Sequence, residues 1–222
     1  MNPDAAPPPW TLTGRAYAVP VRAAFPAGAP IDAGMGGPAG RFVGGPGVVL
    51  AVRYATSDVG PYDELASLPG RVRFGASATF ASVARIVVST PESVAAGRAH
   101  WALPKALATF TWRERADGER LEVCTPDGVP LFAATFAAFG PSLPVAVGGP
   151  FGRIAQPAPD GLRVTPVAGW GWARPARVRD VGVGDAAFEG VRRPWGPAFA
   201  LSRVHLRFGA PERRAVATEG AG

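Results

Sequence analysis

Residues 95–105 read Ala-Ala-Gly-Arg-Ala-His-Trp-Ala-Leu-Pro-Lys, and this stretch decides how the 222-residue sequence is interpreted. It ends in Lys105, the only lysine of the sequence, whereas the other 22 basic residues are arginines. Either cation can carry charge, but only an amine can lose its proton and attack a carbonyl carbon. Lys105 is therefore a candidate nucleophile. The alternative is that an arginine-rich composition has left one lysine on the surface.

The neighbours of Lys105 favour the first interpretation. Trp101 to Pro104 precede the lysine and Ala106 to Ala108 follow it, so the setting is apolar rather than polar. An apolar setting disfavours the charged ammonium form of a lysine and favours the free amine. Pro104 restricts its own backbone and that of Leu103, so we expect the lysine to leave a stiff, extended segment.

The composition excludes several classes of protein. The net charge is +6, but the basic residues are scattered singly or in pairs, with no helix-turn-helix, zinc-finger or RNP-like pattern. Nucleic-acid binding is therefore not expected. The single Cys124 excludes an intramolecular disulfide, and His100 and His205 form no clustered ligand set, so no metal site is predicted. Serine-hydrolase, P-loop and dinucleotide-binding fingerprints are absent too.

The chain has the composition of a globular protein, with 47% hydrophobic and 18% charged residues. We expect one domain over residues 10–210, a disordered N-terminus over 1–9 and a disordered C-terminal tail over 211–222. No secretory signal and no apolar run of about 18 residues is visible, which predicts a cytoplasmic protein without a membrane contact.

Short apolar runs separated by Gly and Pro turns predict many strands and little helix. The expected strands are 11–22, 48–54, 62–68, 71–80, 82–89, 107–115, 119–125, 129–139, 162–167, 171–183 and 199–208. One short helix is predicted from Thr90-Pro91-Glu92 to about Ala99, because Thr suits the cap and Pro the first helical position. Residues 25–47 form a long Gly/Pro/Ala-rich loop, with a short strand possible at 41–43.

Two segments carry a resemblance to a known family. Gly97-Arg98, a spacer and Pro104-Lys105 resemble the Gly-Arg-Glu…Pro-Lys signature of the acetoacetate decarboxylase family, in which the lysine after the proline forms a Schiff base. Residues 60–65, Gly-Pro-Tyr-Asp-Glu-Leu, resemble the family's Gly-x-Tyr-x-Glu segment, whose glutamate belongs to the active site. Weaker similarities at 172–178 and 199–208 extend the resemblance, in order, over most of the chain.

The resemblance implies a mainly β fold, with an antiparallel β-barrel core and a short helix before the active-site lysine. It implies catalytic roles for Lys105 and Glu64 and substrate-binding roles for Arg15, Arg98 and Tyr62, without a cofactor. The alternatives are a solvated acid for Glu64, structural arginines, and packing for Tyr62. A homo-oligomer is also expected, from the family and from the weakly charged loop 25–47.

Two departures from the family pattern affect the function. Ala106 stands where the family's decarboxylases carry a second lysine, and strand 48–54 lacks their second glutamate. The interpretation is a Schiff-base enzyme, a carbon–carbon lyase acting on a small keto acid by decarboxylation or by an aldolase or dehydratase variant. The alternative is a non-catalytic barrel that binds a small carboxylated molecule.

Overall fold

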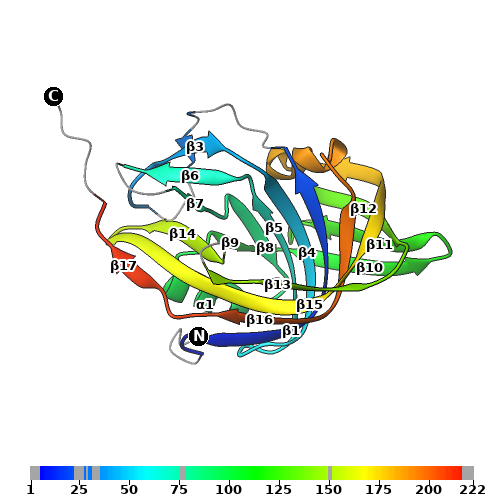
Figure 1. The fold of residues 1–222 in the computed structure, drawn as a ribbon, viewed down its shortest axis with the longest axis horizontal. Coiled ribbons are helices and arrows are strands. Elements are labelled where there is room, and N and C mark those ends of the chain that lie inside the picture. Colours follow the sequence, from blue (N-terminus) through cyan, green and yellow to red (C-terminus); the bar gives the residue numbers. More distant parts are fainter. Residues whose placement is uncertain are drawn as a thin grey trace.

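The computed structural model describes residues 6–22, 28, 30–31, 36–75, 79–149 and 152–216, and most of them are in strands (Figure 1). The strands are β1 (Trp10–Val21), β2 (Pro30–Ile31), β3 (Gly40–Gly44), β4 (Gly47–Thr56), β5 (Tyr62–Leu68), β6 (Arg71–Phe74), β7 (Thr79–Ala81), β8 (Arg85–Val88), β9 (Lys105–Leu107), β10 (Thr109–Arg115), β11 (Gly118–Cys124), β12 (Pro130–Ala138), β13 (Leu143–Val147), β14 (Arg153–Ala158), β15 (Gly161–Val183), β16 (Ala198–Phe208) and β17 (Glu212–Arg214). The helices are α1 (Pro91–Trp101) and the 3-10 helix η3 (Ala186–Arg192). The expected mainly β class with little helix is confirmed.

The strands of the main sheet follow one another in the order β9-β8-β5-β4-β1-β16-β15-β12-β11-β10. Neighbours are antiparallel except β8 and β9, which are parallel. β9 and β10 are the two ends of this order, yet only Ala108 separates them in the sequence. The sheet therefore curls round until its ends approach each other. No strand pairing among the described residues joins β9 to β10, so the sheet stays open where a closed barrel was expected.

A second, smaller set of pairings runs β2-β3-β6-β7-β14-β15-β17. β15 belongs to both sets, and Figure 1 shows it as one long yellow strand across the molecule. The sequence predicted two strands here, separated near Gly169 and Gly171. These glycines do not break the strand. A Cβ at position 169 would lie 2.6 Å from the carbonyl oxygen of His205, so glycine allows β16 to approach closely.

Helix α1 begins where the sequence predicted and ends later, at Trp101. Ala102 ends it with a left-handed backbone, φ 54°, and its N–H bonds the carbonyl of Arg98. Thr90 occupies the cap position, but its side chain makes no capping hydrogen bond. Pro at the start of the helix and Glu92 in its first turn are the sequence features that the structure retains.

Each of the two terminal segments expected to be disordered contains some described residues with defined contacts. Ala6 is buried and its carbonyl accepts a hydrogen bond of 2.8 Å from the Trp10 indole, so structure begins within the segment expected to be disordered. In the C-terminal tail, β17 pairs with β15. Residues 1–5 and 217–222 lie outside the described residues, as do 23–27, 29 and 32–35 of the expected loop, which otherwise holds β2 and β3.

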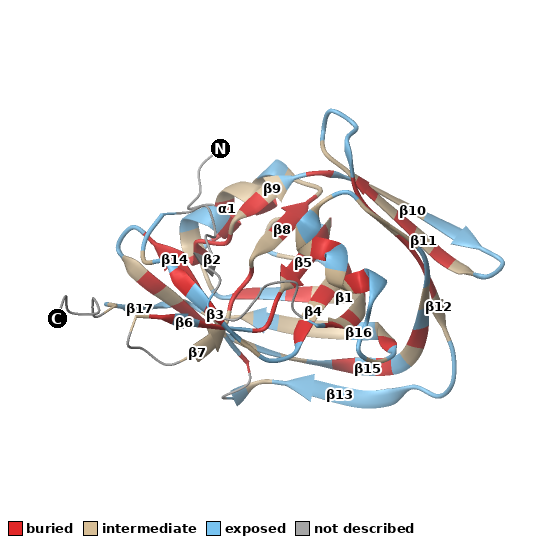
Figure 2. Ribbon diagram, turned by 90° about the horizontal axis from the view of Figure 1, so that it is seen from above, coloured by how far each residue is buried: buried red, intermediate tan, exposed pale blue. Residues whose placement is uncertain are grey.

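The curved sheet separates two apolar layers, and alternate residues of a strand enter different layers. On β5, Leu65 packs with Val49, Leu121 and Phe136 in one layer, whereas Ala66 belongs to the other. Figure 2 shows the buried residues of the strands in red, and residues of both layers are among them. The second layer is the important one for function, because it surrounds the side chain of Lys105. Its largest members are Trp10, Tyr54, Tyr62, Ile86 and Trp101.

Candidate active site

Lys105 is the first residue of β9 and follows helix α1 after a short turn. β9 runs parallel to β8, where Ile86 lies opposite Lys105. The Nε of Arg98 donates a hydrogen bond of 2.7 Å to the carbonyl oxygen of Lys105. Arg98 is exposed, and this hydrogen bond holds the backbone of the lysine in place. The substrate-binding role expected for Arg98 stays a prediction.

The amine of Lys105 is buried, with only 3% of the residue exposed. Its Nζ donates to Ser93 Oγ at 2.9 Å, to Glu64 Oε2 at 3.1 Å and to Tyr62 Oη at 3.4 Å. The ring of Tyr62 also lies 4.9 Å from Nζ, measured to its centroid. A lysine ammonium has three N–H donors, so these three oxygens satisfy it completely.

Glu64 and Tyr62 reach the amine from one face of β5, because residues two apart on a strand point the same way. Tyr54 on β4 lies directly opposite Tyr62. Burial first, and then the negative charge of Glu64, raises the pKa of Tyr54 and of Tyr62 well above the ordinary tyrosine value. Both phenols therefore stay protonated near neutral pH and can donate hydrogen bonds.

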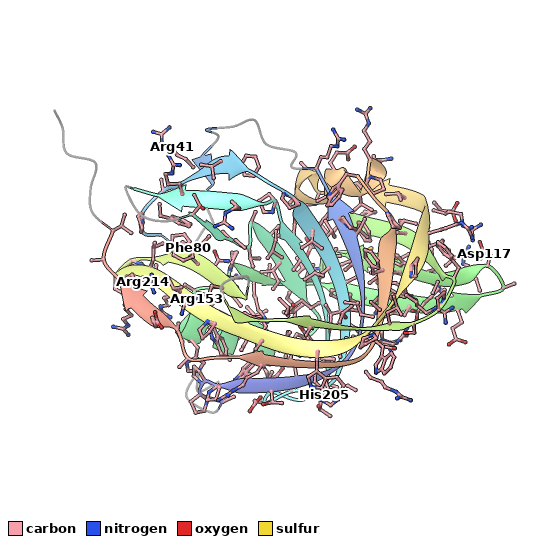
Figure 3. The ribbon with its side chains drawn as sticks, viewed as in Figure 1. Arg41, Phe80, Asp117, Arg153, His205 and Arg214 are labelled. Carbon is pink, nitrogen blue, oxygen red and sulfur yellow. The ribbon has the colours of Figure 1, made fainter. Side chains whose placement is uncertain are left out.

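A cavity of about 360 Å³ opens beside this cluster. It is lined by Trp10, Leu12, Val48, Leu50, Tyr54, Tyr62, Glu64, Ala66, Leu68, Ala81, Val83, Ile86, Trp101, Leu103, Lys105, Val147, Gly152, Arg153, Ile154, Val167, Leu206 and Phe208. Val147 and Arg153 are exposed as well, so the cavity reaches the surface near the beginning of β14, where Figure 3 labels Arg153. The site is thus an amine and a carboxylate in an otherwise mostly apolar chamber.

Arg15 lies outside this cavity, although the sequence placed it beside the substrate. Trp10 and Leu12 of β1 line the cavity, and Arg15, an odd number of residues further on, points to the other face of the strand. There both terminal nitrogens of its guanidinium, Nη1 and Nη2, donate to the carboxylate of Glu119, which also accepts a hydrogen bond of 3.0 Å from Tyr17. The alternation of β1 is the signal that would have placed Arg15 correctly.

Sequence analysis missed two residues of the site, Ser93 and Tyr54. Ser93 lies four positions before Gly97 on α1, so both face β9, and a prediction based on helical spacing would have found it. Tyr54 was visible as the cross-strand partner of Tyr62 once the strands were paired in register. Both residues contribute hydroxyl groups to the site, but neither belongs to a sequence motif that would have marked it.

Ala106, where the family's decarboxylases carry a second lysine, faces away from the cavity. It packs against the first apolar layer, on the opposite side of β9 from Lys105. In this structure a longer side chain at position 106 would enter that layer and would not approach the amine. The loss of the second lysine therefore leaves the immediate surroundings of Lys105 unchanged.

In the described part of the chain, no three His, Cys, Asp or Glu side chains gather in a way that could hold a metal ion. Of the helices within the described ranges, none is long and apolar enough to cross a membrane.

The fold resembles solved structures, although no family model and no curated protein matches the sequence. Acetoacetate decarboxylase from Legionella pneumophila superposes with a TM-score of 0.62 at 13% identity, over 94% of this chain and 88% of that one. An acetoacetate decarboxylase-like enzyme from Sphingomonas wittichii RW1 gives 0.59 at 15%, over 93% and 92%. The enduracididine biosynthesis enzyme MppR, complexed with pyruvate, gives 0.52 at 14%, over 96% and 92%. The chain therefore has the acetoacetate decarboxylase-like fold.

Proposed function

We propose that the protein is a Schiff-base enzyme in which Lys105 attacks the carbonyl group of a keto acid. The observation that carries this proposal is the buried Lys105 amine at one wall of an apolar cavity, 3.1 Å from the carboxylate of Glu64. The adjacent carboxylate can deprotonate this buried amine, and the cavity beside the amine is large enough to hold a molecule with a carbonyl group. The fold shared with acetoacetate decarboxylase is consistent with this chemistry.

The first steps follow from the arrangement of the groups. Glu64 accepts a proton from the ammonium, and the lone pair of Nζ then forms a bond to the carbonyl carbon. The carbonyl oxygen takes one proton from Nζ and one back from Glu64 and leaves as water, which gives the protonated imine. Tyr62 lines the cavity and its hydroxyl accepts a hydrogen bond from Nζ, so in this proposal its own proton is donated to that oxygen while it carries negative charge.

The protonated imine can accept an electron pair from a bond on the carbon atom next to the imine carbon. In a 3-oxo acid the bond to the carboxylate breaks, its electron pair forms an enamine, and carbon dioxide leaves. Glu64, protonated again from water, then gives this proton to the enamine carbon, and water hydrolyses the imine to free the ketone and Lys105. In an aldolase variant the enamine instead attacks the carbonyl carbon of a second compound, or arises when the bond to that carbon breaks. In a dehydratase variant the enamine expels a hydroxyl group, as water, from the neighbouring carbon. These routes use the same two residues, Lys105 and Glu64.

Borohydride trapping tests the proposal directly, because Lys105 and the N-terminal α-amine are the only primary amines in the sequence. Incubation with acetoacetate or pyruvate, followed by borohydride, should leave a reduced adduct on the peptide that contains Lys105. Peptide mapping separates this adduct from one on the N-terminus. Lys105→Arg keeps the charge but removes the reactive amine, so it should abolish both the adduct and turnover.

The second candidate is a binding protein of the same fold without catalysis. One observation favours it: the three donors of the Lys105 ammonium are all satisfied by oxygen atoms, as in a stable ion pair. This candidate predicts no adduct on Lys105 between pH 6 and 9 with any keto acid. It also predicts that Lys105→Arg binds the ligand with unchanged affinity, which would overturn the enzymatic proposal.

A further inference from the structure

The cavity beside Lys105 is elongated, because it follows two paired strands. Glu64, Ala66 and Leu68 line it from one face of β5. A strand rises about 3.3 Å per residue, so Glu64 and Leu68 lie roughly 13 Å apart along the strand. Leu50 and Val48 of β4 stand opposite Ala66 and Leu68 and form the adjoining wall over the same length. The reactive amine is at the Glu64 end of this channel.

The chemistry of the lining changes sharply along that length. The tyrosines, the carboxylate and the amine gather at the Lys105 end, whereas the wall beyond Glu64 on β4 and β5 is hydrocarbon, supplied by Val48, Leu50, Ala66 and Leu68. Ala81 of β7, Val83 between β7 and β8, and Ile154 of β14 continue it. Water in such a space would find few hydrogen-bond partners, and apolar cavities of this kind stay dry or take up apolar molecules.

The volume sets the size of the molecule that fits. An apolar protein cavity of about 150 Å³ holds one benzene ring. The cavity here measures about 360 Å³, more than twice that volume. It therefore accommodates roughly a dozen non-hydrogen atoms on the same scale. Pyruvate and acetoacetate, with six and seven such atoms, would leave much of the hydrocarbon channel unfilled.

We propose that the natural substrate is a keto acid with a hydrophobic tail, a straight or branched chain or a ring, that lies along β4 and β5. This inference rests on the proposed function, because it places the keto carbon at Lys105. The tail extends past Ala66 towards Leu68 and Val48, where burial of each methylene group contributes to binding. The channel selects substrates by the length and the apolar character of this tail.

A chain-length series tests this inference on the wild-type protein. Half-saturating concentrations for borohydride trapping are measured with 2-oxobutanoate, 2-oxohexanoate, 2-oxooctanoate and 2-oxodecanoate. We expect the concentration to fall about four-fold for each added methylene group until the channel is full. Equal values along the whole series would overturn the inference while leaving imine formation by Lys105 intact.

Ala66→Leu supplies a second test, because position 66 lies midway along the channel. The added carbons narrow the channel, so the ratio of affinities between 2-oxooctanoate and 2-oxobutanoate should collapse. Ala99→Leu is the matched control, since Ala99 is exposed on α1 and the same change there should keep the wild-type ratio. A ratio that stays as large in Ala66→Leu as in the control contradicts the placement of the tail.

Failure of the proposed function gives a different pattern. Calorimetric titration with n-butanol, n-hexanol and n-octanol probes the channel without a carbonyl group, so no imine is involved. Steep dependence on alcohol length, lost in Ala66→Leu, together with no Lys105 adduct from any keto acid, would retain the apolar channel and reject the enzyme. No dependence on alcohol length would reject the channel as a binding site for a hydrophobic tail.

Discussion

Gly97 and Lys105 are in direct contact, and the lysine side chain occupies the space that a side chain at position 97 would need. A Cβ atom at position 97 would lie 2.5 Å from Cδ of Lys105 and 2.8 Å from its Cε. Contacts this short do not occur, so any side chain at position 97 must displace the lysine. The Gly-Arg pair that marks this stretch in the sequence therefore has two separate functions: the glycine makes room for the side chain, and Arg98 holds the backbone.

Gly97→Ala should accordingly move the Lys105 amine away from Glu64. An alanine normally stabilises a helix interior by about 0.5–1 kcal/mol relative to glycine. Here we expect the opposite, a loss of about 1–3 kcal/mol from overpacking, together with slower borohydride trapping. Denaturant unfolding and trapping rates measure the two effects. Gly196→Ala is the control, because a Cβ there would meet nothing within 4 Å. A more stable Gly97→Ala protein with normal trapping would refute the contact.

Glu64→Gln keeps the shape of the side chain and removes its charge and basicity. If Glu64 moves the protons of the reaction, the rate of adduct formation should fall about 10²–10⁴-fold. Trapping at limiting borohydride measures this rate. Glu122→Gln is the control, because Glu122 is on β11 in exposed ion pairs with Arg113 and Arg120. A normal rate in Glu64→Gln would leave Glu64 with only a structural role.

The three tyrosines of the chain should titrate at unusually high pH. Burial, and then the charge of Glu119, raises the pKa of Tyr17 to about 12, and burial, and then the charge of Glu64, raises the pKa values of Tyr54 and Tyr62 well above the ordinary value. A raised pKa in the folded state means that the neutral phenols stabilise the fold fully below about pH 10, and that this stability is lost as pH rises through the folded values.

Ultraviolet absorbance of tyrosinate checks this expectation. The native protein should show no ionisation step near pH 10, whereas the guanidinium-unfolded protein should ionise all three tyrosines there. Tyr17→Phe should remove the step near pH 12 in the native protein. A one-tyrosine step near pH 10 in the native wild type would contradict the structure around that residue.

Arg15 is expected to stabilise the fold without binding substrate. Arg15→Met removes the partner of the buried Glu119 carboxylate, and Arg53 approaches that carboxylate only to 3.9 Å. Because nearly half of the Arg15 side chain is exposed, the free energy of unfolding should fall only modestly, by about 1–2 kcal/mol. Half-saturating concentrations of keto acids should not change. Arg113→Met, which breaks an exposed pair, should cost less. Weaker keto-acid binding in Arg15→Met alone would restore the role that the sequence suggested.

The exposed apolar edge at β13 gives a reason to expect a homo-oligomer. Leu143, Val145 and Val147 of β13 are exposed, and so are Trp170 and Trp172 on the adjacent part of β15. Exposed apolar strand edges usually pair with another chain. Light scattering should give a multiple of 22.9 kDa. Val145→Lys should shift the protein towards the monomer, whereas Val129→Lys, in an exposed turn, should not. A monomer in the wild type would reject the expectation.

The sequence signals of the candidate site are local. Lys105 is unique in composition, and Glu64 was indicated by the family resemblance of residues 60–65. Tyr62 and Glu64 lie two residues apart on the predicted strand 62–68, which agrees with their common face in the structure. Arg15 was misplaced because the family resemblance was followed in place of the alternation that begins at Trp10. Ser93 was missed because a serine in the first turn of a helix is usually read as part of the helix start.

Long-range pairing explains most of the remaining differences in the fold. Whether β9 pairs with β10 depends on how far the whole sheet curls, and no single segment determines that curl. Gly169 and Gly171 look like a turn in the sequence, yet the close approach of β16 makes them part of one strand. The pairing of β17 with β15 likewise depends on a contact with a distant partner and not on the short, charged segment itself.

β1 lies between β4 and β16, so an early strand of the chain is paired along its length with one made nearly 190 residues later. Trp10 and Leu12 come from β1, and Leu206 and Phe208 from β16, and all four line the cavity of Lys105. Pairings between such distant segments form slowly and cannot form before both partners exist. On the ribosome, the cavity around Lys105 therefore lacks the wall formed by Leu206 and Phe208 until β16 has emerged.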